Sequence, residues 1–188
     1  LLYLLESLHK KFKVEFLITK EVRKEVIDDP KSIKRFELGA LRLEALFKKG
    51  VIKHADLKKD DINELREIRD NLMQIANSTF KVKGTDIHLI DKGEAAALAL
   101  SIIMKNKTGI NIPLAIDERT TRMLCENPEN LRKLLEKKLH SNLKANRNNY
   151  DSFKHFKIIR STEIAYIAYK NNLVELKSPG TLEAILYG

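Results

Sequence analysis

One stretch of the chain, Asp91–Arg122, constrains the fold more than any other. It reads DKGEAAALALSIIMKNKTGINIPLAIDERTTR and contains an alanine-rich helical pattern, a short connection and an apolar run over Ile112–Ile116. Asp117 and Glu118 end this run, and a new helical pattern follows. A short apolar run between two helical patterns is typical of a buried strand in a parallel sheet. Because ligands bind beyond the carboxyl ends of such strands, Asp117 is the first candidate for chemistry.

The rest of the chain also alternates between strand and helix patterns. We expect further strands over 13–19, 51–54 and 156–159. We expect helices over 21–28, 32–49, 61–76, 92–105, 118–125, 128–140 and 162–169, with Thr19 and Ser161 or Thr162 as caps. The helix over 32–49 has an apolar face formed by Ile33, Phe36, Ala40, Leu43 and Phe47. The helix that Asp60 or Asp61 opens has an apolar stripe formed by Ile62, Leu65, Ile68, Leu72 and Ile75. Residues 77–90 show little pattern and are interpreted as a loop. The alternation predicts one α/β domain, 1–188, with a mostly parallel sheet.

The positive charge of the chain is concentrated in one segment. The net charge is +9, and residues 128–160 contain nine Lys or Arg against three acidic residues. A patch of this kind favours nucleic acid as partner, although a lysine-rich surface can also serve solubility or heat tolerance. The tract over 141–151 is rich in Asn and polar, which is typical of a mobile loop. We therefore interpret 128–155 as a basic insertion made of a helix and a loop.

Three aromatic residues, Tyr150, Phe153 and Phe156, lie among these charges. Their rings could stack on unpaired bases or pack in a core beneath the insertion, and for Phe156 we favour the core.

Composition narrows the class of protein. Hydrophobic residues make up 43% of the chain and charged residues 32%, as in soluble globular proteins. The apolar runs are too short to cross a bilayer, and no secretory leader is visible. Cys125 is the one cysteine, which excludes an internal disulfide and a Cys-based zinc site. We expect a cytoplasmic protein that does not contact membranes.

Acidic residues recur where helices are expected to begin: Glu25, Glu94, the pair Asp117–Glu118, and Glu163. Each has a local explanation. Glu94 fits a capping box with Asp91, and Asp117 could be an N-cap. If the carboxylates converge instead, two charges 4 Å apart repel by about 4 kcal/mol at an effective dielectric constant near 20, so the cluster needs a cation or shared protons. Mg²⁺ or Mn²⁺ would suit oxygen ligands and could activate water for phosphodiester hydrolysis.

Four segments in this order resemble the PIN-domain family: Thr19–Ile27 (TKEVRKEVI), Gly93–Leu100 (GEAAALAL), Ala115–Arg122 (AIDERTTR) and Ile159–Ala168 (IRSTEIAYIA). The resemblance implies a three-layer α/β/α fold with a central parallel sheet. It also implies a Mg²⁺- or Mn²⁺-dependent endoribonuclease that cuts single-stranded RNA.

By position, Glu25, Glu94 and Asp117 match the metal-binding acids of that family, and Glu118 matches a frequent second acid. Thr162, or Ser161 beside it, matches a late hydroxyl, and Glu163 is an accessory acid. The first strand of the family, with its metal-binding Asp, does not precede Leu1 in this sequence. We expect it upstream; the alternative is a family member that lacks this ligand.

The basic insertion departs from the family pattern and is the candidate RNA-binding segment. Predicted nucleic-acid contacts come from Arg119, Arg122, Arg132, Lys133, Lys137, Lys138, Lys144, Arg147, Lys154, Lys157 and Arg160. A homodimer or another protein partner is also compatible with the sequence. Two alternative functions remain: a catalytically inactive RNA-binding module in RNA processing or ribosome assembly, and the toxin of a toxin–antitoxin pair.

Overall fold

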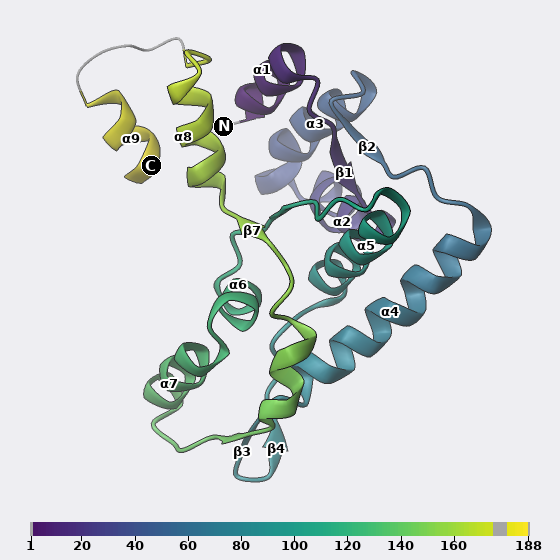
Figure 1. Ribbon diagram of the computed structural model, residues 1–188. Coiled ribbons are helices and arrows are strands. Elements are labelled where there is room, and N and C mark those ends of the chain that lie inside the picture. The colour runs from purple at the N-terminus through teal and green to yellow at the C-terminus, as the bar shows by residue number, and fades with distance from the viewer. Residues whose placement is uncertain (1, 175–179, 188) are drawn as a thin grey trace. The chain divides into compact units, whose positions relative to one another are not determined.

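The structure is a computed structural model that describes residues 2–174 and 180–187 (Figure 1). The chain forms two compact units. Unit 1 comprises Leu1–Asp56 and Ile159–Gly188, and unit 2 comprises Leu57–Ile158. Both units are mainly helical and contain short strands, which confirms the prediction of a mixed α/β chain. The three-layer PIN-like arrangement and the single domain stay predictions.

Unit 1 is built from helices around a short parallel strand pair. Strand β1 (Phe16–Ile18) pairs with β2 (Ile52–His54), with Phe16 opposite Ile52. The helical elements are α1 (Leu2–Phe12), α2 (Lys20–Arg23), the π-helical turn η1 (Lys24–Asp28), the 3₁₀ turn η2 (Pro30–Ser32), α3 (Lys34–Lys48), α8 (Ser161–Lys170) and α9 (Thr181–Tyr187).

Apolar clusters stabilise unit 1. Helix α1 packs on α8 through Leu4 and Leu8, which cluster with Ala165 and Ala168. The end of α3 packs beside β2, where Leu46 is buried. The predicted cap is confirmed, because Thr19 Oγ1 accepts a hydrogen bond from the Val22 amide (3.2 Å).

The predicted apolar face of α3 is only partly buried. Ala40 is buried, but Phe36 near the start of the helix is 51% exposed and Ile33, its N-cap residue, is 48% exposed. The reason is that the cluster beside β2 reaches only the second half of the helix, where Leu43 and Phe47 pack against Leu46. The periodicity therefore predicted the helix correctly but overestimated how much of its apolar face is covered.

Unit 2 has one large core. Its helices are α4 (Lys59–Asn77), α5 (Lys92–Thr108), α6 (Arg119–Glu126) and α7 (Pro128–Leu139), followed by the 3₁₀ helix η3 (Arg147–Ser152). Helix α4 packs along α5, and both contribute to the core. The predicted apolar stripe of α4 is confirmed, since Leu65 and Leu72 are buried. No helix in the described part of the chain has the length and apolar character needed to cross a membrane.

The segment predicted as a loop, 77–90, contains a β-hairpin. Strand β3 (Phe80–Val82) pairs with β4 (Thr85–Asp86) in antiparallel orientation. Lys83 and Gly84 both have positive φ, 49° and 88°, as a type I′ turn requires. The loop prediction is therefore wrong, because strands of two and three residues are too short to show an alternating pattern.

The strand predicted over Ile112–Ile116 is shorter and less buried than expected. Only Leu114–Ala115 form a strand, β5, and within the run only Ile116 is buried. Pro113 explains the difference, because proline has no amide hydrogen for a ladder and is confined to strand edges. The Leu114 amide donates to the Lys157 carbonyl (2.8 Å), just before β7 (Ile158–Ile159).

Candidate metal site and basic face

The predicted catalytic residues are divided between the two units. Glu25 and Thr162 belong to unit 1, whereas Glu94, Asp117 and Glu118 belong to unit 2. Glu25 is exposed on the π-helical turn η1, where the Asp29 amide donates to the Lys24 carbonyl (2.8 Å). π-Helical turns are frequent at functional sites.

At the start of α8, the predicted hydroxyl cap is wrong. Arg160 is the N-cap residue, so Ser161 and Thr162 lie inside the first turn. The Arg160 amide donates to Glu163 Oε2 (2.8 Å), and the Arg160 side chain forms an ion pair with the same carboxylate (3.4 Å). A carboxylate at the third helical position can accept a hydrogen bond from a free amide at the start of the helix, just as a capping hydroxyl can.

The capping role of Glu94 is confirmed. Its carboxylate accepts a hydrogen bond from the Asp91 amide (2.9 Å) at the start of α5. The Asp91 carboxylate in turn contacts His88 Nε2 (2.7 Å). This arrangement orients the Glu94 side chain.

Glu118, rather than Asp117, is the N-cap of α6. Its two carboxylate oxygens accept from the Thr120 amide (2.8 Å) and the Thr121 amide (2.5 Å). Partial burial alone would raise the pKa of Glu118, but the hydrogen bonds from Thr121 and Thr120 outweigh it and lower the pKa. Asp117 precedes this cap and is exposed.

The donor chemistry of these acids suits Mg²⁺ or Mn²⁺, which prefer carboxylate oxygens. Within neither unit does the described chain gather three Asp, Glu, His or Cys side chains as a metal site.

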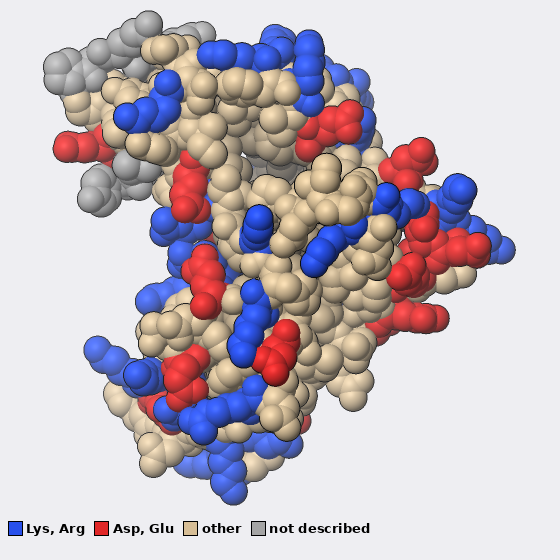
Figure 2. Space-filling view, in the orientation of Figure 1, with Lys and Arg blue, Asp and Glu red and all other residues tan. Residues whose placement is uncertain are grey.

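A second feature of unit 2 is a group of exposed lysines, which we call the basic face. Figure 2 shows Lys and Arg side chains gathered at the end of unit 2 where Figure 1 places α7 and the hairpin. The lysines of the basic face come from α7, from the hairpin and from β6 (Lys144–Ala145), and they are Lys133, Lys137, Lys138, Lys81, Lys83 and Lys144.

The sheet aligns two of these lysines. Strand β6 pairs with the free edge of β3, which places Lys144 opposite Lys81 and Ala145 opposite Phe80. Because Phe80 is fully buried, the alternation of side chains along β3 places Lys81 on the outer face. Lys81 and Lys83 were not among the predicted nucleic-acid contacts. The turn residues Lys83-Gly84 were the one signal of a hairpin, and a hairpin would have placed both lysines in an exposed strand and turn.

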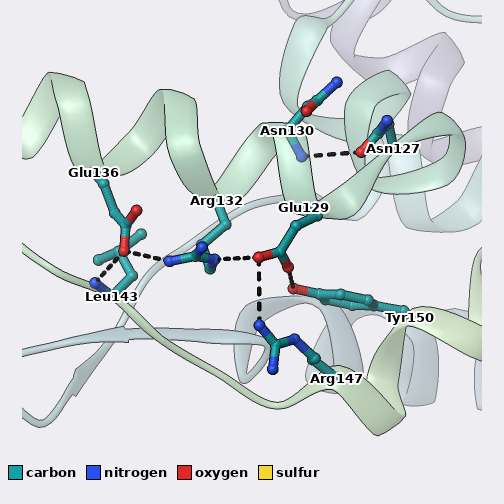
Figure 3. A network of polar contacts seen from close by, with 8 residues as sticks. All are labelled: Asn127, Glu129, Asn130, Arg132, Glu136, Leu143, Arg147 and Tyr150. Atoms are coloured by element: carbon teal, nitrogen blue, oxygen red, sulfur yellow. Dashed lines mark hydrogen bonds and ion pairs between the residues drawn. The ribbon is translucent and has the colours of Figure 1, made fainter.

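Two of the predicted RNA contacts, Arg132 and Arg147, form ion pairs within the insertion (Figure 3). Arg132 lies between two carboxylates, with Nε 2.7 Å from Glu129 and Nη1 2.5 Å from Glu136. Arg147 reaches Glu129 at 3.4 Å. The hydrogen bond from Arg132, aided by Arg147, lowers the pKa of Glu129. These contacts join α7 to the segment that contains η3.

The other predicted RNA contacts differ in their surroundings. Lys154 forms an ion pair with Asp151 (2.5 Å). Arg119 and Lys157 are exposed, whereas Arg122 is half-buried and its Nε atom is buried without a partner in the described part of the chain.

The aromatic residues of the insertion belong to the core. Phe153 is fully buried, and Tyr150 and Phe156 are 8% and 7% exposed, so the proposal that they stack on bases is wrong and the core interpretation is confirmed. The Asn-rich tract is also structured. Asn149 Nδ2 donates to the Ile75 carbonyl at the end of α4 (3.0 Å). The Asn149 side chain thus connects the tract to the end of α4.

The contacts described above define the structural role of each predicted site residue. Comparison of the chain with protein-family models, with curated proteins and with solved structures gives no match.

Proposed function

We propose that the protein is a PIN-type endoribonuclease that cuts single-stranded RNA with the help of Mg²⁺ or Mn²⁺. The observation that carries the proposal is the position of Asp117 and Glu118, exposed at the junction where β5 ends and α6 begins. This is where α/β proteins bind ligands. The order in which Glu25 and Glu94 precede this junction supports the same function.

Glu25, Glu94, Asp117 and Glu118 would hold the metal ion. A bound divalent ion would lower the pKa of a water molecule and stabilise negative charge on the phosphodiester. The protein itself would supply carboxylates to orient the ion and the Thr162 hydroxyl as a further hydrogen-bonding group. The basic face would bind the phosphates of the RNA.

The experiment is an RNA cleavage assay with the full-length protein. A labelled single-stranded RNA is incubated with Mg²⁺, with Mn²⁺ or with EDTA, and the products are separated by size. Cleavage that needs a divalent ion supports the proposal, and absence of cleavage with every divalent ion tested contradicts it.

A second candidate function is an RNA-binding module without catalytic activity. It is favoured by the local roles of two predicted ligands, because Glu94 caps α5 and both oxygens of Glu118 cap α6. RNA binding that persists in EDTA, without cleavage under any metal, would favour this candidate over the nuclease.

A further inference from the structure

Unit 2, which the structure describes completely, keeps all of its phenylalanine and tyrosine rings away from solvent. Phe80 and Phe153 are fully buried, and Tyr150 and Phe156 are less than a tenth exposed. Among the histidines of this unit, His155 lies against the Phe156 ring (4.2 Å between centroids) and His88 is paired with Asp91. The basic face therefore has charge but no Phe or Tyr ring on which a base could stack.

This distinction separates two classes of nucleic-acid partner. Proteins that bind unpaired strands combine a basic groove with aromatic rings that stack on bases, at about 1–3 kcal/mol per base. Double-stranded RNA is recognised mainly through its phosphates, its 2′-hydroxyls and its shape, because its base edges are poorly accessible. Because the described surface of unit 2 presents no Phe or Tyr ring, it favours the second kind of contact.

Two pairs of lysines on the basic face start from backbone positions that the sheet and the helix fix. Lys81 and Lys144 are directly opposite on neighbouring strands, which places their Cβ atoms about 5 Å apart. Lys133 and Lys137 are one helical turn apart on α7, about 6 Å along its axis. Lysines on fixed backbone positions suit the regular phosphate array of a duplex.

Polar contacts connect the elements that carry these lysines (Figure 3). Glu136 on α7 accepts from the Leu143 amide (2.9 Å), immediately before β6. Tyr150 donates to Glu129 (3.1 Å) and so links η3 to α7. Both contacts lie within unit 2. The lysines of α7 and β6 therefore belong to elements that hydrogen bonds connect.

We infer that the basic face binds duplex RNA through its phosphates. This inference rests on the proposed function and names its substrate class more closely. The substrate is an RNA with a duplex arm, bound by unit 2, next to an unpaired segment that is cut.

The test is equilibrium binding of the full-length protein to RNA in EDTA, so that cleavage does not interfere. A duplex RNA and one of its strands alone, each carrying a fluorophore, are titrated over a range of salt concentrations. The variant is the triple substitution Lys81→Gln, Lys83→Gln and Lys144→Gln. The control is Lys58→Gln, Lys59→Gln and Lys105→Gln, which removes the same charge from exposed lysines at the start of α4 and on α5.

We expect the duplex to bind more tightly than the single strand. The triple variant should lose about tenfold or more in duplex affinity, and its log–log salt slope should fall by about 1 for each lysine that contacts a phosphate. The control should retain most of the affinity. Tighter binding of the single strand, or a triple variant that binds like the control, overturns the inference and leaves RNA binding itself in place. Binding of neither RNA overturns both the inference and the proposed function.

Discussion

The Tyr150 hydroxyl donates a hydrogen bond to the Glu129 carboxylate over 3.1 Å (Figure 3). Tyr150 lies in the Asn-rich tract and Glu129 in the first turn of α7. This hydrogen bond therefore connects the tract to the helix of the basic insertion. Burial of the phenol, together with this hydrogen bond, raises the pKa of Tyr150 to about 12.

The first prediction concerns alkaline pH. A raised pKa means that the folded protein holds the phenol proton more tightly than the unfolded chain. The stability due to Tyr150 is therefore complete below its ordinary pKa of 10.0 and is lost as the pH rises to about 12. Urea unfolding at several pH values should show a steeper loss above pH 10 in the wild type than in Tyr150→Phe. Equal slopes in the two proteins would contradict this account.

The second prediction concerns the core of the insertion. Phe153→Ala should lower the free energy of unfolding by about 3–5 kcal/mol, because it leaves a cavity at a fully buried position. The milder Phe153→Leu should cost clearly less. Thermal and urea unfolding measure both variants. A Phe153→Ala protein as stable as the wild type would mean that the ring is not in the core.

The third prediction concerns Cys125, which is 6% exposed. Burial and the neighbouring Glu126 raise the pKa of its thiol to about 12, so almost no thiolate exists at pH 8. A thiol reagent should modify the folded protein very slowly and the urea-unfolded protein quickly. Rapid modification without denaturant would show that this part of unit 2 opens readily.

The fourth prediction concerns Glu118 as the cap of α6. Glu118→Ala should destabilise the protein by about 1 kcal/mol at neutral pH, the usual effect of losing an N-cap. Because the pKa of Glu118 is lowered, its contribution is present above its ordinary pKa of 4.5 and is lost as the pH falls through the lowered value. The difference between wild type and variant should therefore shrink in acid. Chemical unfolding at neutral and acidic pH measures it, and a difference that grows in acid would contradict this role.

Local patterns predicted the helices of this chain well. The apolar stripe of α4 and the capping box of α5 were readable because their partners lie three or four residues apart. The hairpin was not readable, since its strands are very short and its only sequence signal was the turn at Lys83-Gly84. Asn149 was interpreted as loop composition, yet its side chain binds a carbonyl 74 residues away.

For the candidate site, local sequence patterns predict even less. That Glu94 begins a helix follows from its neighbours in sequence. That Glu25 and Asp117 would bind one ion depends on contacts between distant segments, which no local pattern reports. The burial of Phe153 likewise depends on the whole core of unit 2.

The most direct measurement is the rate of RNA cleavage by the Asp117→Asn variant in Mn²⁺, compared with the wild type and with Asp60→Asn. Asp60 is an exposed aspartate at the start of α4 and does not belong to the proposed site. Loss of a metal ligand should slow cleavage by about 100-fold or more, with RNA binding in EDTA unchanged. The nuclease account predicts this loss for Asp117→Asn and wild-type rates for Asp60→Asn. Cleavage by Asp117→Asn at the wild-type rate would contradict it.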